Sequence, residues 1–298
     1  MATDTAWLGI DIGASSTKLA LVDGEGAVAA TAQSAAYEQP ELKALTDAIR
    51  DALCRMLDHA TRNAAHLAGV GLAVPGPVEA GGTTLPRCGN LPALEGTDAT
   101  LWMRDVVGMD VAVRVATDQY AAAFAEFTAN PLPGRTLFLA LGTGVGGAVL
   151  DDGQPLIFTR GTPGHLGHID ISGGDPDAPA TEAAGRGALE AYLGAPSLRS
   201  LAMPLEEPAA CASHPAMPDI IDALARGLRI MFAIYRMDHI VLLGGVSPVF
   251  DVVLDRLTNH IRDGLTTVAP ADWTIAVGTT GFHAGAIGAA RLAADAAP

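Results

Sequence analysis

The chain has 298 residues, 49% of them hydrophobic, which suggests one large domain or two medium ones. Its net charge of −15 argues against nucleic acid as a partner, because phosphate backbones are bound by clustered Lys and Arg. We find neither an apolar run of the roughly 18 residues that a membrane helix needs nor a secretory signal in MATDTAWLG. The three scattered cysteines fit neither a disulfide framework nor a zinc cluster, so we expect a cytoplasmic protein without a membrane partner.

Residues 8–23, LGIDIGASSTKLALVD, predict two strands joined by a tight turn. The turn is rich in small and charged residues, namely Asp11, Gly13, Ser15, Ser16, Thr17 and Lys18. Glycine and hydroxyl residues allow backbone N–H groups to converge on an anion. Asp11, at the mouth of the turn, could hold Mg²⁺ directly or through water. Taken alone, the stretch is equally compatible with an ordinary hairpin that has a polar turn.

The next segments alternate between strand and helix patterns, which indicates an α/β sheet. We expect strands at 27–33, 68–74 and 111–115, and helices from Pro40 to about residue 60, at 97–107 and from 118 through 127. Asp118 follows the third of these strands at the start of a helix. It could reach a ligand at the sheet edge, or it could be the N-cap of that helix.

Residues 139–153, LALGTGVGGAVLDDG, again predict strand, glycine turn and strand, with Thr143 and Gly144 in the turn. We interpret this stretch as an internal duplicate of the first hairpin. Two hairpins of the phosphate-binding type are much harder to explain by chance than one.

The second half adds a glycine-rich loop with His165 and His168, which could be incidental, contact sugar hydroxyls or bind a metal. Helices are expected at 181–193, 218–237, 250–267 and 284–294, and strands at 239–243 and 273–277. The strand at 239–243 ends in Gly244-Gly245. Such an end lets a flat ligand lie against the backbone, facing the N-terminus of the next helix.

Nine motifs together resemble the ROK group of sugar kinases, within the actin-like ATPase superfamily. In chain order they are LGIDIGASSTKLALVD, VGLAVPGPV, GNLPAL, ATDQYAAAFAEF, LGTGVGGAVLDDG, GHLGHIDI, GRGALEAYL, VLLGGVS and AGAIGAARLA. The resemblance implies an α/β fold of two actin-like (ribonuclease H-like) lobes with a cleft between them. It places residues 1–117 and the C-terminal helix 285–298 in a small lobe, and 118–284 in a large one.

The resemblance also implies roles for individual residues. Asp118 would be the general base for a substrate hydroxyl, and Asp11 would hold Mg²⁺ through water. The two turns would bind the phosphates of ATP through Gly13, Ser15, Ser16, Lys18, Thr143 and Gly144. Gly244 and Gly245 would face the adenosine. The sugar would contact Asn90, Thr117, Asp118, His165, His168 and Glu190. The family often dimerises, so a homodimer is expected.

Three positions depart from the family pattern. Its zinc cluster combines a histidine with three cysteines, but residues 170–190 contain no cysteine, so we expect no zinc. His165 stands in place of a usual Glu, and Thr117 in place of the Asn before the general base. Pockets that form hydrogen bonds with substrate hydroxyls discriminate strongly between substrates, so these changes favour a substrate other than ordinary glucose. A cyclitol, amino sugar or nucleoside kinase, a polyphosphate-using glucokinase and a non-catalytic sugar sensor remain alternatives.

Overall fold

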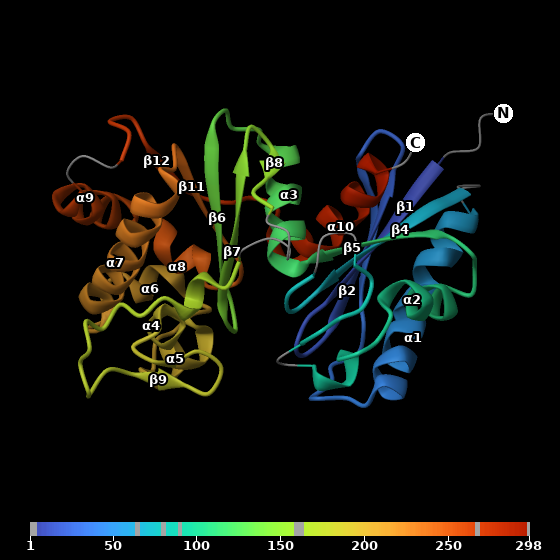
Figure 1. Ribbon diagram of the computed structural model, residues 1–298, viewed down its shortest axis with the longest axis horizontal. Helices are drawn as coiled ribbons and strands as arrows, with labels where there is room; N and C mark the ends of the chain where they lie inside the picture. The colour runs from blue at the N-terminus through green and yellow to red at the C-terminus, as the bar shows by residue number, and fades with distance from the viewer. Residues whose placement is uncertain are drawn as a thin grey trace. The chain divides into compact units, whose positions relative to one another are not determined.

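The computed structural model describes residues 5–62, 66–78, 82–88, 91–157, 164–265 and 269–296 (Figure 1). The described residues form two compact units. The first comprises Met1–Asn130, Ile157–Thr162 and Phe282–Pro298, and the second comprises Pro131–Leu156 and Pro163–Gly281. The first unit thus continues through the helix after Asp118, whereas the predicted small lobe stops at residue 117. No helix in the described part of the chain is long and apolar enough to span a membrane.

The first unit is built on a five-stranded sheet in the order β3–β2–β1–β4–β5. Strands β1, β2 and β3 are antiparallel neighbours, whereas β4 and β5 run parallel to β1. The strands are β1 (Thr5–Ile12), β2 (Thr17–Asp23), β3 (Val28–Gln33), β4 (His66–Val74) and β5 (Ala112–Thr117). The helices are α1 (Leu42–Arg62), η1 (Pro92–Leu94), α2 (Ala99–Val107), α3 (Asp118–Ala129) and α10 (Ala284–Asp295).

Helix α10 packs directly on β1, β2 and β4, and on α3, because small residues line both sides of the contact (Figure 1). A Cβ atom at Gly9 would overlap Ala286 O, and one at Gly71 would overlap Ala289 O. The sequence AGAIGAARLA therefore lets the backbone of α10 approach the sheet closely. This packing also explains why α3, which lies against α10, belongs to the first unit.

The second unit repeats the same topology, with strands in the order β12–β11–β6–β7–β8. The strands of this sheet are β6 (Arg135–Leu141), β7 (Val145–Asp151), β8 (Gln154–Pro155), β11 (His239–Leu243) and β12 (Thr274–Val277). Strands β6, β7 and β8 are antiparallel neighbours, and β11 and β12 run parallel to β6. The predicted α/β fold is confirmed, and the repeated strand order agrees with the predicted internal duplicate.

The remaining elements of the second unit cover this sheet or extend from it. They are η2 (Leu166–His168), β9 (Ala180–Thr181), β10 (Gly185–Arg186), α4 (Leu189–Leu193), α5 (Ala195–Ser200), α6 (Pro208–Cys211), α7 (Met217–Tyr235), α8 (Ser247–Asp251) and α9 (Leu254–Gly264). Helices α7 and α9 lie side by side (Figure 1). The short helix η3 (Gly281–His283) leads into α10.

Two predicted helices are wrong in extent. Residues 181–188 form the hairpin β9–β10 and turns, and the helix begins only at Leu189, because Gly185 and Gly187 adopt positive φ angles of 85° and 74°. The helix expected at 250–267 is instead two helices, α8 and α9, that meet at Val252 and Val253. Residues 266 and 267 lie outside the described residues.

Candidate functional site

The first hairpin places two opposite charges on adjacent strands at the edge of the turn. Asp11 near the end of β1 is directly opposite Lys18 at the start of β2, and Lys18 Nζ lies 3.7 Å from Asp11 Oδ2. Asp11 is buried, and burial raises the pKa of its carboxyl although Lys18 opposes the shift. Lys18 Nζ also lies 5.1 Å from the centroid of the Phe282 ring.

The turn between β1 and β2 is fixed by a tyrosine that the sequence analysis missed. The Tyr37 hydroxyl donates to Gly13 O at 2.8 Å and contacts Thr17 Oγ1 at 2.9 Å, while Tyr37 N donates to Ser15 O at 2.9 Å. Burial raises the pKa of Tyr37 to about 12, so its hydroxyl keeps its proton. Tyr37 lies four residues after β3, and no pattern in the sequence links it to the turn.

The two serines of this turn face different surroundings. Ser15 is exposed, whereas Ser16 is buried and its hydroxyl accepts a hydrogen bond from Gln33 Nε2 at 2.9 Å. Gly13 N donates to Ser16 O at 3.1 Å, and a Cβ atom at Gly13 would lie 2.9 Å from Lys18 Nζ. The turn is therefore tight, and its glycine leaves room for the lysine. The phosphate-binding roles of these residues stay predictions.

Asp118 is the first residue of α3 and not its N-cap. The N-cap is Thr117, whose Oγ1 accepts the N–H of Tyr120 at 3.2 Å, and Asp118 Oδ1 accepts the N–H of Gln119 at 2.9 Å. The N-cap interpretation of Asp118 is thus wrong, because the preceding hydroxyl residue takes that position. Burial, and next the negative charge of Asp11, raise the pKa of the Asp118 carboxyl to about 7.

The surroundings of Asp11 fit a hydrated Mg²⁺ ion. Carboxylate oxygens are ligands that Mg²⁺ prefers, and this buried carboxylate has one cation at 3.7 Å to balance it. Gly285 of α10 makes room for the carboxylate, since a Cβ atom there would lie 2.6 Å from Asp11 Oδ2. Among the residues that the structure describes, no three His, Cys, Asp or Glu side chains converge on one metal position, so the ion would keep most of its water.

The glycine turn of the second hairpin is bound to the segment that follows α4. Gly142 N donates to Gly144 O at 2.9 Å, and Gly142 O accepts the N–H of Ala195 at 2.8 Å. Glu190 Oε2 accepts the N–H of Val145 at 2.9 Å. Thr143 is exposed at the tip of the turn. The structure therefore brings together Thr143, Gly144 and Glu190, which the sequence analysis assigned to different ligands.

The glycine pair after β11 combines one strained and one open position. Gly244 has a φ angle of 88°, and a Cβ atom there would overlap Leu141 O at the end of β6. Gly245 is exposed, and a Cβ atom there would meet nothing within 4 Å. Gly244 is thus required by the backbone, whereas Gly245 leaves an open surface that a ligand could approach.

The two histidines of η2 are neighbours, with ring centroids 5.8 Å apart. Both are exposed, and partial removal of water, followed by the proximity of His168, lowers the pKa of His165. A neutral imidazole can donate one hydrogen bond and accept another. Asn90 lies outside the described residues, so its predicted sugar contact is not described.

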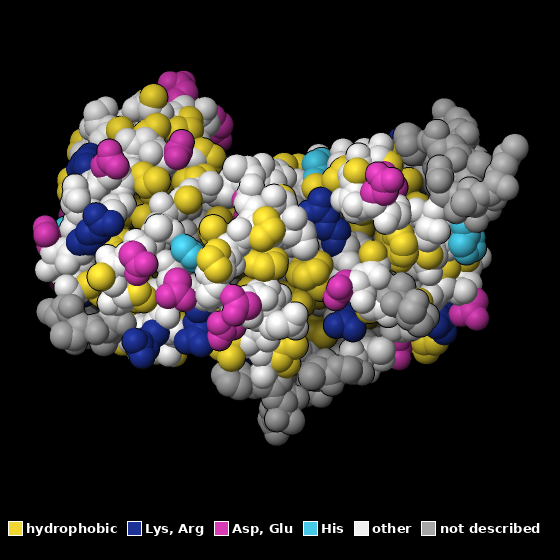
Figure 2. Space-filling view, turned by 90° about the horizontal axis from the view of Figure 1, so that it is seen from above, with side chains coloured by type: hydrophobic (Ala, Val, Ile, Leu, Met, Phe, Trp, Pro, Cys, Tyr) yellow, Lys and Arg dark blue, Asp and Glu magenta, His cyan; other side chains and the backbone are white. Residues whose placement is uncertain are grey.

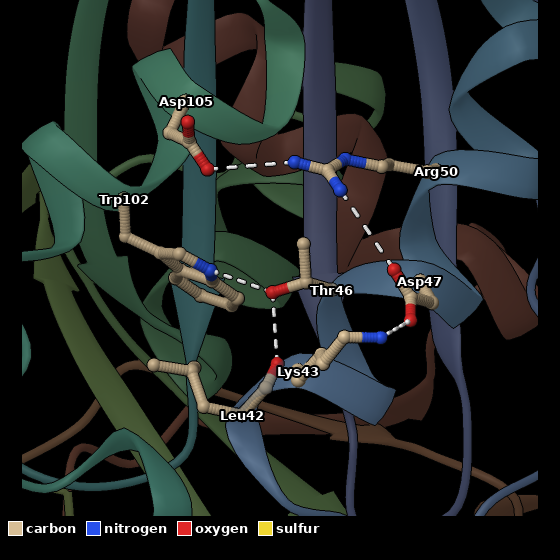
Figure 3. A pocket seen from close by; sticks show the side chains of 7 residues that line it. All are labelled: Leu42, Lys43, Thr46, Asp47, Arg50, Trp102 and Asp105. Carbon is tan, nitrogen blue, oxygen red and sulfur yellow. Dashed lines mark hydrogen bonds and ion pairs between the residues drawn. The ribbon is translucent and has the colours of Figure 1, made fainter.

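A shallow cavity of about 470 Å³ between α1 and α2 contains none of the predicted site residues (Figure 3). Its charged side chains pair with one another: Lys43 with Asp47 at 3.1 Å, and Arg50 with Asp47 at 3.7 Å and with Asp105 at 3.4 Å. On its floor, Trp102 Nε1 donates to Thr46 Oγ1 at 3.0 Å. We interpret the cavity as the groove where α1 and α2 pack against each other.

The charges on the surface are mixed where Figure 2 shows them. On that face, acidic side chains lie between basic ones, and hydrophobic side chains are scattered among both. The view shows no gathering of Lys and Arg on the described part of this face, as expected for a chain with a net charge of −15.

Comparisons with known proteins extend over nearly the whole chain. The family model described as "ROK family" matches residues 7–296. A glucokinase of Halalkalibacterium halodurans is 26% identical, with 97% of this chain and 95% of that protein covered. An N-acetylmannosamine kinase of Citrobacter koseri is 32% identical over 49% of this chain and 48% of that protein. The crystal structure of a ROK family glucokinase from Streptomyces griseus with glucose and AMPPNP matches with a TM-score of 0.78 and 23% identity, covering 97% of this chain and 99% of that chain.

Proposed function

We propose that this chain, which belongs to the ROK family, is an ATP-dependent kinase that phosphorylates a hydroxyl group of a sugar or sugar-like polyol. The observation that carries the proposal is the Asp118 carboxyl, held at the start of α3 with a pKa raised to about 7. A carboxyl with such a pKa is about half ionised at neutral pH, and its carboxylate form accepts a proton readily.

In the proposed reaction, Asp118 accepts the proton of the substrate hydroxyl while that oxygen attacks the γ-phosphorus of ATP in line. The bond from the γ-phosphorus to the bridging oxygen breaks, and ADP leaves. The rest of catalysis in such a transfer is positioning and neutralisation of charge. Thr117 supports this role by acting as the N-cap of α3, so that only one oxygen of the Asp118 carboxylate, Oδ1, is bound to a backbone N–H of the helix.

The two glycine turns would hold the phosphates in this proposal. Gly13, Ser15, Ser16 and Lys18 contribute from the first turn, and Thr143 and Gly144 from the second. Asp11 would hold Mg²⁺ through water, and the ion would neutralise phosphate charge when bound. The exposed, uncrowded Gly245 beside the strained Gly244 supports their assignment to adenosine.

The proposed sugar shell consists of Asn90, Thr117, Asp118, His165, His168 and Glu190. Thr117 Oγ1 accepts the N–H of Tyr120, so its hydroxyl proton and its second lone pair remain for a substrate. His165 supplies an imidazole where the family usually has a carboxylate. Relatives of the chain are named for glucose and for N-acetylmannosamine. We propose an amino sugar, other modified hexose or cyclitol in preference to ordinary glucose.

A screen of ADP release over hexoses, amino sugars, inositols and nucleosides tests the proposal. We expect ATP-dependent turnover with at least one polyol, and a higher kcat/KM for a substrate other than glucose. Competition between ATP and polyphosphate identifies the donor, and activity with polyphosphate alone would replace ATP. Sugar binding without phosphorylation across the panel would contradict a kinase and favour a sensor. We also propose that the protein is cytoplasmic, forms a homodimer and holds no zinc. Light scattering tests the dimer, and metal analysis tests the zinc content.

A further inference from the structure

Glu190 connects two parts of the proposed site that lie far apart in the sequence. It is in the first turn of α4, where a substrate hydroxyl is the proposed partner of its carboxylate. In the structure, its Oε2 atom accepts the N–H of Val145, 45 residues earlier, at 2.9 Å. Val145 directly follows the second glycine turn. The carboxylate is therefore already bound to the turn that we assign to phosphate.

The fit between Glu190 and the turn depends on two glycines. A Cβ atom at Gly144 would lie 2.6 Å from Glu190 Oε2. A Cβ atom at Gly194 would lie 2.9 Å from Glu190 O and 3.0 Å from Thr143 O. At Gly194 the atoms in the way are backbone oxygens, so this approach favours glycine, whereas a side chain at position 144 would displace the Glu190 carboxylate.

Hydrogen bonds tie both ends of the turn to the same short segment. Gly142 O accepts the N–H of Ala195 at 2.8 Å, and Val145 N donates to Glu190. The turn from 142 to 145 is thus held at its start by the residue after Gly194 and at its end by the carboxylate of α4. Only the second of these two contacts comes from a side chain that a substrate could also touch.

We propose that Glu190 is a positioning residue that orients the second phosphate turn and couples its geometry to occupation of the sugar site. One oxygen, Oε2, holds the turn, and among the described residues Oε1 accepts no hydrogen bond. Oε1 is thus left for a substrate hydroxyl. A hydroxyl that binds Oε1 restrains the carboxylate, and the carboxylate restrains the N–H groups of the turn. The coupling to sugar and nucleotide rests on the proposed function, but the contact with Val145 does not.

Two measurements on the full chain test the inference, with Glu190→Ala, Glu190→Gln and the control Glu182→Ala. Glu182 is an exposed carboxylate in the same loop region, outside the proposed site. The first measurement is hydrogen exchange at the Val145 amide. We expect exchange to rise about tenfold in Glu190→Ala, since a hydrogen bond to a charged acceptor is lost. We expect a smaller rise in Glu190→Gln, which keeps a neutral acceptor, and none in the control.

The second measurement is the Kd of AMPPNP with Mg²⁺, without and with saturating substrate from the screen. In the wild type, we expect the substrate to tighten AMPPNP binding, and the ratio of the two Kd values gives the coupling. In Glu190→Ala, we expect weaker AMPPNP binding without substrate, by about three- to tenfold, and a ratio near one. If Glu190 only stabilised the fold, Glu190→Ala would have a lower melting temperature. The protein that still binds AMPPNP would then keep the wild-type ratio of the two Kd values.

The outcomes separate this inference from the proposed function. Wild-type protein that binds no AMPPNP contradicts the proposed function, while exchange at Val145 still tests the contact. Unchanged exchange and unchanged AMPPNP affinity in Glu190→Ala would overturn the inference and leave Glu190 as a sugar ligand alone. If circular dichroism shows that Glu190→Ala is unfolded, Glu190→Gln decides: faster Val145 exchange supports the inference and wild-type exchange overturns it.

Discussion

The two glycine hairpins share one topology but differ in the chemistry of their turns. The first hairpin, β1–β2, carries a buried carboxylate and a lysine 3.7 Å apart. The second, β6–β7, has glycines and Thr143 in its turn and no charged residue there. Each turn is held by a residue from outside the hairpin: Tyr37 holds the first, and Glu190 holds the second. The repeated fold therefore supplies two similar backbone turns, and neighbouring elements give each one its own chemistry.

The charged pair of the first hairpin is the largest difference, and Asp11→Asn removes its carboxylate. We expect kcat/KM to fall about 100- to 1,000-fold, because the proposed water-mediated hold on Mg²⁺ is lost. Steady-state kinetics over a range of Mg²⁺ concentrations measure the effect, and high Mg²⁺ should restore part of the activity. Glu25→Gln, in the exposed turn between β2 and β3, is the control. Activity within threefold of wild type in Asp11→Asn would show that the first hairpin does not depend on this charge.

The surroundings of the second hairpin are tested by Gly244→Ala and its neighbour Gly245→Ala. We expect Gly244→Ala to lower the free energy of unfolding by about 2 to 3 kcal/mol, through its positive φ angle and its overlap with Leu141 O. Gly245→Ala should leave the free energy of unfolding unchanged but weaken AMPPNP binding if adenosine lies there. Denaturant unfolding and calorimetry measure the two quantities. Equal stability of both variants would contradict the assigned strain at Gly244.

Much of this architecture could be predicted because it depends on local patterns. Both hairpins, the strand that ends in Gly244-Gly245 and the small-residue helix α10 are visible as apolar runs bounded by glycines. The helix at 181–193 was wrong because helical spacing of apolar residues does not reveal that Gly185 and Gly187 take positive φ angles.

Contacts between distant residues could not be read from the sequence. Tyr37 reaches Gly13 across 24 positions, and Glu190 reaches Val145 across 45. Neither contact has a periodicity that a sequence window could detect. The N-cap of α3 could not be decided from the sequence for a more local reason, since Thr117 and Asp118 are both common capping residues and only backbone geometry distinguishes them.

The raised pKa of Asp118 predicts that the effect of Asp118→Asn on the free energy of unfolding depends on pH in the ligand-free protein. The folded-state pKa of about 7 lies above the ordinary 3.8, so between these values the folded protein keeps a proton that the unfolded chain loses. Asp118 therefore lowers stability increasingly from pH 4 to pH 7. We expect the variant to be more stable by about 1 to 2 kcal/mol at pH 8, discounted for partial exposure, and equal to wild type near pH 4. Denaturant unfolding at both values measures this, and a constant difference would contradict the raised pKa.

The smallest effect concerns the support of the first turn. Tyr37→Phe removes the hydroxyl that donates to Gly13 O, and we expect a loss of about 1 kcal/mol in the free energy of unfolding. Tyr235→Phe is the matched control, because among the described residues the hydroxyl of this half-buried tyrosine makes no hydrogen bond. Thermal unfolding compares the two variants. Equal melting temperatures would show that Tyr37 does not stabilise the turn.

The central claim is that the two turns bind a nucleotide while Asp118 activates an alcohol. The most direct measurement compares kcat with AMPPNP affinity in Asp118→Asn, using the best substrate from the screen. We predict a fall in kcat of about 100- to 10,000-fold with a Kd for AMPPNP within threefold of wild type, because only proton acceptance is removed. Full turnover by Asp118→Asn would contradict the account.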